Sequence, residues 1–416
     1  MAEVRGEPVS DTPGGMVGTV EDVDPPATEQ TRPRKESARK LQLVEAAGQL
    51  FQEHGYHRVS MEDIAQRVGI RGPALYRHFR SKQDILARVV LEQISVTASV
   101  VETAANFEGS AQERFDMMTE DLARLVLARD EAMLWRWERR NLSENDVAAY
   151  RTRARQLKAA AALVISGLRP DATAADVELL SWAVLSVFGH SRGLRSSNGR
   201  DSSAGLLRRF AAAVVQVPLK EGGVSEETPT FRAGGRREQI IEAATRLFAA
   251  RGFVDVSMED VAAEADAALA TIYQYFDSKL ALLGVILRRS IEGLNYVVTH
   301  RLAGLPTPES ELDALLDLYV ELALGPHGRT FSIFDEEVRM LSEEERTDLL
   351  KGYRGHVGQW VSVLRETRPE LGSSEARARV RTALGLAADI TQTPRLRVRK
   401  TLHQDLVTLM TALLRS

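Results

Sequence analysis

Two stretches of this chain are near copies of each other, and they constrain the fold more than any other feature. Residues 59–65, Val-Ser-Met-Glu-Asp-Ile-Ala, recur at 256–262 with valine in place of isoleucine. The pattern Tyr-x-x-Phe-x-Ser-Lys ends at Lys82 in the first copy and at Lys279 in the second, again 197 residues later. Two blocks that recur at one separation indicate an internal duplication. The chain is therefore expected to fold into two similar units.

The repeated stretch has the signals of two short helices joined by a tight turn. Ser60 and Asp63 have the spacing of a capping box that starts the first helix. Gly69 can adopt the left-handed conformation that a sharp turn between helices requires. Gly72 and Pro73 open a second helix of about two turns, because proline at the first helical position loses no hydrogen bond. A helix-turn-helix of this kind places its second helix in the major groove of DNA.

The second of these helices is expected to have one buried face and one exposed face. Leu75 and Phe79 have the spacing of core residues. The side chains left for another surface are Arg71, Ala74, Tyr76, Arg77 and His78. In the second copy Asp266 replaces Gly69, and aspartate tolerates the left-handed conformation better than most residues. We therefore expect the turn to survive there.

Composition favours an ordinary globular protein and excludes several kinds of site. Hydrophobic residues make up 44% of the chain and charged residues 27%, which is typical of globular domains. The chain has no cysteine, so disulfides, thiolate chemistry and cysteine zinc sites are excluded. The net charge is −4, so DNA binding has to depend on local basic patches. No apolar run reaches the ~18 residues of a membrane helix and the acidic N-terminus is no signal peptide, so we expect a cytoplasmic, nucleoid-associated protein without membrane contact.

Helical periodicity and changes in composition mark the domain boundaries. Leu, Val and Ala recur at helical spacing outside the repeated blocks, and sustained alternation typical of strands is absent. The basic end of the N-terminal tail is either a solubilising extension or an arm that contacts DNA. The predicted domains are a disordered tail (1–36), a first helix-turn-helix domain (37–87), a first helical ligand and dimerisation domain (88–219), a linker (220–235), a second helix-turn-helix domain (236–284) and a second helical ligand and dimerisation domain (285–416).

The duplication continues beyond the helix-turn-helix. Glu138 and Arg140 recur as Glu337 and Arg339, which are 199 residues later. Each half therefore has the same plan, with about two residues inserted in the second half. The repeated Glu-x-Arg can be explained as an ion pair inside each half.

These residues resemble the TetR/AcrR family of bacterial transcription regulators, twice in one chain. The resemblance is carried by the Ala-Ala…Leu-Phe…Gly pattern at 46–55, by residues 60–65, and by Leu-Tyr-Arg-His-Phe-x-Ser-Lys at 75–82. It implies an all-α fold in which each unit has a three-helix DNA-binding head and a helical-bundle body that holds a small molecule. Family members pair through the last two helices of the body, so the tandem arrangement implies a pseudo-dimer formed by the two halves, with a higher assembly possible on DNA.

The resemblance and the chemistry of the side chains together indicate which residues contact DNA. Phenol, imidazole and ammonium groups can donate to phosphates, whereas arginine reads guanine and small apolar groups read the thymine methyl. The candidates in the first head are Ser60, Arg71, Gly72, Ala74, Tyr76, Arg77, His78 and Lys82. Those in the second head are Ser257, Thr271, Tyr273, Gln274, Tyr275 and Lys279. For any of them the alternative is a solvated helix surface.

Aromatic residues of the two bodies are the candidates for a ligand pocket, although each can equally be an ordinary core residue. They are Trp135, Trp182, Phe188, Phe331, Phe334 and Trp360. The apolar bodies and the family resemblance suggest a small apolar effector, such as a lipid, a steroid or an acyl thioester. We expect no cofactor and no metal, and the common catalytic motifs of hydrolases and phosphate-binding enzymes are absent.

The sequence therefore predicts a ligand-responsive DNA-binding regulator rather than an enzyme. We expect a repressor released by its effector, with two non-identical heads on an asymmetric double-stranded operator. The alternative is an effector-binding or scaffolding protein whose degenerate heads no longer read DNA.

Overall fold

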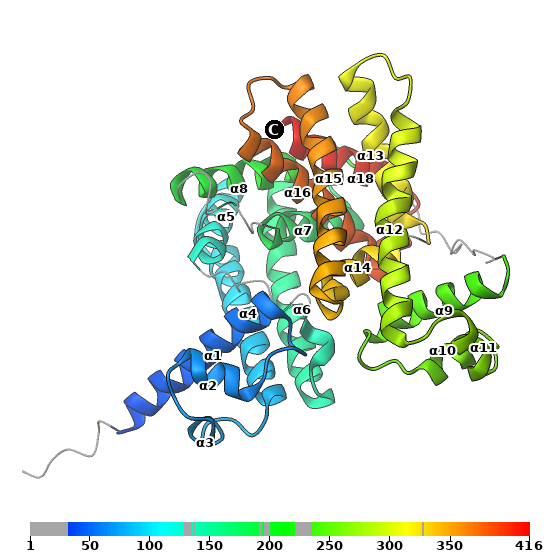
Figure 1. The fold of residues 1–416 in the computed structure, drawn as a ribbon. Helices are drawn as coiled ribbons and strands as arrows, with labels where there is room; N and C mark the ends of the chain where they lie inside the picture. The colour runs from blue at the N-terminus through cyan, green and yellow to red at the C-terminus, as the bar shows by residue number, and fades with distance from the viewer. Residues whose placement is uncertain are drawn as a thin grey trace, which may run out of the picture. The chain divides into compact units, whose positions relative to one another are not determined.

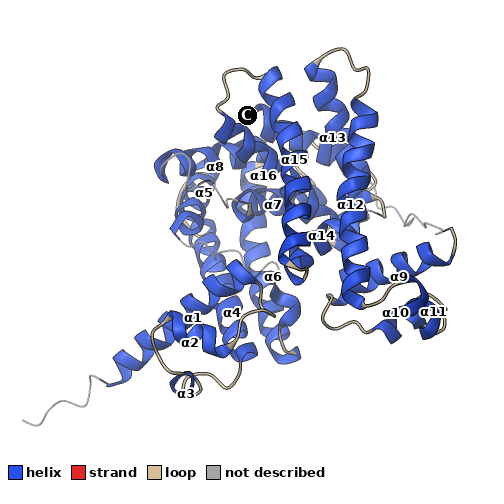
Figure 2. Ribbon diagram, in the orientation of Figure 1, coloured by secondary structure: helices blue, strands red, loops and turns tan. Residues whose placement is uncertain are grey.

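The computed structural model describes residues 32–128, 135, 138–190, 194, 200–220, 234–326 and 328–416. The chain divides into two compact units, Met1–Leu41 and Gln42–Ser416, and every contact described below lies within the second. The regular elements of the described ranges are helices, which confirms the predicted all-α class (Figure 2).

The first half of the chain contains eight α-helices and a short 3₁₀ helix in its described residues. They are α1 (Arg32–His54), α2 (Met61–Arg67), α3 (Gly72–Leu75), α4 (Lys82–Ala105), α5 (Ala111–Ala128), η3 (Glu138–Asn141), α6 (Glu144–Leu168), α7 (Ala174–Gly189) and α8 (Arg200–Val215). Helices α1 to α3 form the first head, and α4 onward form the first body (Figure 1).

The second half repeats this order. Its helices are α9 (Arg236–Arg251), α10 (Met258–Glu264), α11 (Leu269–Tyr275), α12 (Lys279–Leu302), α13 (Pro308–Leu324), α14 (Gly328–Glu337), η4 (Val338–Met340), α15 (Glu343–Thr367), α16 (Ser373–Thr391), α17 (Pro394–Arg397) and α18 (Leu402–Arg415). Helices α9 to α11 form the second head, and α12 onward form the second body.

Two boundaries differ from the sequence prediction. Helix α1 begins at Arg32, five residues before the predicted domain boundary at residue 37; Pro33 lies in its first turn, where the missing N–H of proline is harmless. The α-helical part of α3 is one turn, not two, and Tyr76 is its C-cap. Residues 1–31 of the predicted tail and 221–233 of the predicted linker lie outside the described residues.

An arginine binds the end of the last helix in both bodies, and this shared contact supports the duplication. Arg169 donates to the backbone oxygens of Val215 (2.7 Å) and Val217 (3.0 Å), at the end of α8. Arg368, 199 residues later, donates to the oxygens of Leu414 (3.0 Å) and Ser416 (3.2 Å), at the end of α18. The repeat therefore extends to the last residues of each half.

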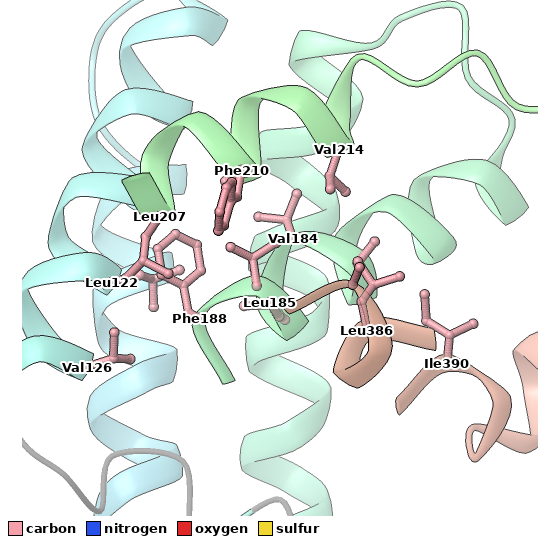
Figure 3. Packing of buried hydrophobic residues seen from close by; sticks show 14 of the residues in the cluster. Leu122, Val126, Val184, Leu185, Phe188, Leu207, Phe210, Val214, Leu386 and Ile390 are labelled. Carbon is pink, nitrogen blue, oxygen red and sulfur yellow. The ribbon is translucent and has the colours of Figure 1, made fainter. Parts of the chain in front are cut away.

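The two bodies pack against each other through their last long helices. Helix α7 contacts α16, and α8 contacts α18, so four helices form one interface within a single chain. In Figure 3, Phe188, Phe210 and Val184 of α7 and α8 fill the first body, with Leu386 and Ile390 of α16 beside them. This is the helix arrangement that the pseudo-dimer prediction requires.

Candidate nucleic-acid interface

The first short helix of each head is capped as the sequence predicts. Asp63 N–H donates to the Ser60 hydroxyl (3.1 Å), and the Asp63 carboxylate accepts from Ser60 N–H (2.8 Å). Ser257 and Asp260 make the same two bonds at 3.0 and 2.8 Å. The bonds from the Ser60 side chain and backbone hold the pKa of Asp63 below its usual value. Both predicted serines therefore cap helices, and whether they also contact DNA stays a prediction.

The turn between the two short helices also has the predicted geometry. Gly69 has φ +70°, and Asp266 at the matching position has φ +47°. A left-handed residue at this point lets the chain reverse direction within the turn. The second head thus keeps the turn without the glycine.

The residues predicted to read DNA lie on the outside of each head. Leu75 and Phe79 are buried as predicted, at 0% and 1% exposure, whereas Tyr76 is 58% exposed. Arg71 and Arg77 are exposed as well. Three members of the first set lie deeper: Ala74 and His78 are half-buried, and Gly72 is buried against the Glu62 side chain.

The second head presents a different set of side chains at the same place. Tyr273 is 48% exposed and Tyr275 is 45% exposed. Gln274 is exposed, and Thr271 is half-buried. Neither tyrosine nor glutamine carries a charge at neutral pH, so this surface lacks the two guanidinium groups of the first head.

Lys82, predicted as a phosphate contact, binds the loop between α1 and α2. Its ammonium donates to the backbone oxygens of Tyr56 (2.9 Å) and His57 (3.3 Å) and lies 4.3 Å from the centre of the Tyr56 ring. Burial lowers the pKa of Lys82, and the nearby charge of Glu138 opposes that shift. The lysine therefore ties the start of α4 to its head, and a DNA contact stays a prediction.

Lys279 makes the equivalent contacts in the second head, and we call this set of lysine-to-loop hydrogen bonds the lysine clasp. Its ammonium lies 4.4 Å from the centre of the Phe253 ring and donates to the backbone oxygens of Phe253 (2.8 Å), Val254 (3.3 Å) and Val256 (2.6 Å). Burial is again the largest effect on the lysine pKa and lowers it. Both heads thus have one scaffold, consisting of a capped helix, a left-handed turn and a lysine clasp.

A carboxylate links the second head to its body, and sequence reasoning missed this role. Glu337 is 3% exposed, and its Oε1 accepts from the backbone N–H of Phe253 at 3.0 Å. Phe253 follows the end of α9, while Glu337 ends α14 of the body. The recurrence of Glu138 as Glu337 was a signal of a shared role, but it did not identify a backbone N–H as the partner.

The pocket candidates of the first body do not form one group. Phe188 is fully buried in the core (Figure 3). Trp135 is 3% exposed, and its ring lies 6.3 Å from that of Tyr150. Trp182 is half-buried, with the Lys158 ammonium 5.8 Å from its ring centre. These three residues therefore belong to separate contacts.

Two of the three candidates in the second body do come together. Tyr319 stacks on Phe331 (5.4 Å between ring centres) and meets Trp360 edge-on (6.0 Å). Phe334 instead packs beside Tyr353 (5.5 Å) in the core shared with the second head. We call Tyr319, Phe331 and Trp360 the aromatic cluster.

A cavity of about 550 Å³ lies elsewhere, between α1 and α2 of the first head and two arginines of the second half, Arg339 and Arg346. Arg58, which also lines it, donates to the backbone oxygen of Arg339 at 2.7 Å. The cavity wall is mainly polar, so its chemistry differs from that of the apolar pocket predicted from the sequence. Among the described residues no helix is long and apolar enough to cross a membrane.

Comparison with known proteins places both heads in one family. The model of "Bacterial regulatory proteins, tetR family" matches residues 43–89 and 240–286. The chain is 39% identical over 72 residues to the transcriptional activator FasR of Mycolicibacterium smegmatis, which covers 17% of this chain and 32% of that protein. It is 28% identical over 136 residues to the transcriptional repressor KstR2 of Rhodococcus jostii, covering 32% of this chain and 66% of that protein.

One solved structure is similar to part of the chain. A TetR-family transcriptional regulator from Bordetella parapertussis aligns with a TM-score of 0.38 and 21% identity, over 42% of this chain and 93% of its own. The chain spans 32% and 66% of the lengths of the two curated relatives named here. The matching family model describes regulatory proteins and the two curated relatives are transcription regulators, which confirms the prediction that the chain is not an enzyme.

Proposed function

The chain belongs to the tetR family of bacterial regulatory proteins through its two heads, and on this premise we propose that it is a ligand-responsive transcriptional repressor that uses both heads on one asymmetric operator. The observation that supports the proposal is that the two heads share the contacts that hold their helices in place but differ in their exposed side chains. The capping box, the turn and the lysine clasp are the same in the two heads, whereas Arg71 and Arg77 at the ends of α3 are replaced by Ala268 at the start of α11 and Gln274 within it.

The surface of the first head favours G·C base pairs. Arg71 and Arg77 are exposed, and an arginine that bonds guanine through two N–H groups contributes about 1–3 kcal/mol of discrimination. The matching residues in the second head are Ala268 and Gln274, and glutamine is suited to adenine. We therefore propose that the first head dominates recognition and that the second adds affinity because it is tethered nearby.

Phosphate contacts are proposed for the exposed phenol groups. Tyr76 and Tyr273 occupy the same position in the two heads and keep about half of their surface exposed. A phenol hydroxyl can donate to a phosphate oxygen without reading the base sequence. Replacing either tyrosine with phenylalanine should thus weaken binding to all sequences about equally.

The proposed effector is a small apolar molecule, such as a lipid, a steroid or an acyl thioester. The support is the aromatic cluster of the second body, where Phe331 belongs to α14. Helix α14 also carries Glu337, which holds the end of α9 through Phe253. A ligand that moves α14 would therefore disturb the position of the second head, and release of DNA would follow.

The test begins with selection of the operator from random duplexes, followed by footprinting of variants. Arg71→Ala and Arg77→Ala should each relax sequence preference in one half-site only, while Gln274→Ala should change the other half-site. Tyr76→Phe serves as the matched control, because it should lower affinity without changing preference. Equal losses at two symmetric half-sites would contradict the asymmetric operator, and failure to select any sequence would favour the effector-binding or scaffolding alternative.

A further inference from the structure

Two residues at the same position of the repeat meet at the interface between the bodies. His190 and Asp389 are 199 residues apart, which is the separation that relates the two bodies throughout. His190 Nε2 lies 2.9 Å from Asp389 Oδ2, and the two side chains are only 18% and 6% exposed. In a symmetric pair of identical units this position would face its own copy, so two identical residues would meet there. In this chain a histidine meets an aspartate instead.

A second pair of equivalent positions has diverged beside the first. Ser186 and Gly385 are also 199 residues apart. The Ser186 hydroxyl, fully buried, donates to the same Oδ2 of Asp389. Gly385 lies against the His190 ring, and a Cβ at this position would overlap that ring. Ser186 thus gives Asp389 a hydrogen-bond donor, and the absence of a side chain at Gly385 leaves space for the His190 ring.

Pairing of like halves would lose both features. If two first halves paired through α7 in the same way, serine would replace Gly385 on each side, and its Cβ would overlap the opposing histidine ring. If two second halves paired through α16, two Asp389 carboxylates would face each other in a buried site. Like charges that share a buried site strongly disfavour ionisation of both groups.

We propose that Ser186, His190, Gly385 and Asp389 match the first half of the chain to the second and exclude pairing of like halves. This specificity rests on the within-chain pairing of the proposed function and gives a reason for it: every pair contains one head of each kind. Residues that repel the wrong partner are a known route to interface specificity.

Exchange of the residues between the halves tests the proposal in the full-length chain. The double variant Ser186→Gly/His190→Asp gives both halves the glycine and aspartate, and Gly385→Ser/Asp389→His gives both the serine and histidine. Each should lower the midpoint of thermal unfolding by about 5 °C or more. The fourfold variant, which swaps the two sets, should recover most of this loss.

The fourfold variant decides the question even if both doubles fail to fold. Purely structural roles predict that four substitutions at this interface are at least as damaging as two, so a fourfold variant no more stable than the doubles would overturn the proposal. Doubles as stable as the native chain would overturn it as well. Arg209→Gln is the matched control, because Arg209 lies at the same interface, 3.7 Å from Glu375, but is 58% exposed and should change the midpoint little.

A cross-link separates this inference from the within-chain pairing on which it rests. The chain has no cysteine, so His190→Cys/Asp389→Cys introduces two unique thiols that a short bis-methanethiosulfonate reagent can bridge. A bridge within one chain is expected, with a native solution mass of one chain. A bridge between chains would show that the halves pair across two chains and would contradict the proposed single-chain assembly, while the swap experiment would still report on the matching of unlike halves.

Discussion

Acidification should destabilise the second body through one buried histidine. His356 is 2% exposed, and burial lowers its pKa from 6.5 to about 4. Its Nε2 accepts from the indole N–H of Trp360 at 3.2 Å, so the neutral ring carries its proton on Nδ1. Protonation of Nε2 would place an N–H of the imidazole against the indole N–H and would put a positive charge in the core. Protonation is therefore less favourable in the folded state than in the unfolded state.

The size of the effect follows from the two pKa values. Between pH 6.5 and pH 4 the unfolded chain binds more protons than the folded one, so the free energy of unfolding rises with pH. The contribution is present above pH 6.5 and is lost as the pH falls through this window. The loss is about 2 kcal/mol between pH 7 and pH 5 and approaches about 3 kcal/mol near pH 4.

Urea unfolding followed by tryptophan fluorescence at pH 7, 6 and 5 measures this loss. In His356→Gln the amide oxygen can still accept from Trp360, but the side chain has no charge to gain, so the pH dependence should fall by about 2 kcal/mol over this range. His300→Gln is the control, because His300 is exposed on α12. An unchanged pH dependence in His356→Gln would refute the reasoning, since the carboxylates that titrate in both proteins cancel in the comparison.

Substitutions at four positions test the scaffold of the heads. Lys279→Met should lower stability by about 1–3 kcal/mol through the loss of its carbonyl bonds and should speed amide hydrogen exchange in the loop after α9. Glu337→Ala should cost about 1–3 kcal/mol, measured by urea unfolding, because a buried N–H loses its acceptor, and Glu337→Gln should restore most of it. Gly69→Ala should cost about 1–2 kcal/mol in thermal unfolding although an added Cβ there meets no atom within 4 Å, whereas Asp266→Gly should change stability by less than about 1 kcal/mol.

Local signals predicted the heads well because their causes are local. A capping box needs residues three apart, and a left-handed turn needs one tolerant residue, so Ser60 and Asp266 could be interpreted from the sequence alone. The length of α3 could not, because the same pattern forms a four-residue helix in the first head (α3) and a seven-residue helix in the second (α11). The contact of Lys82 with the loop was missed because a lysine can donate to any oxygen within reach. The loop carbonyls come within reach of Lys82 only when the chain folds.

Long-range pairs were predictable only through the repeat. Nothing near His190 in the sequence indicates a carboxylate partner, and Asp389 lies 199 residues away. Placing the two halves in register brings both residues to one position, and the pairing of the terminal helices then brings them into contact. The ligand site had no such guide, because an aromatic residue at helical spacing fits a core and a pocket equally well, as Phe188 and Phe331 show.

The insertion that distinguishes the halves lies where the second body meets its head. Helix α13 begins 197 residues after α5, but Glu337 follows Glu138 by 199, so the two extra residues enter between Pro308 and Glu337. The stretch between α13 and Glu337 therefore does not correspond residue for residue to the stretch between α5 and Glu138. Helix α14, which joins the aromatic cluster to the second head, lies in this stretch. The heads and the interface have thus kept one plan while the connection between them has changed, and the response of one head to a ligand cannot be transferred to the other by symmetry.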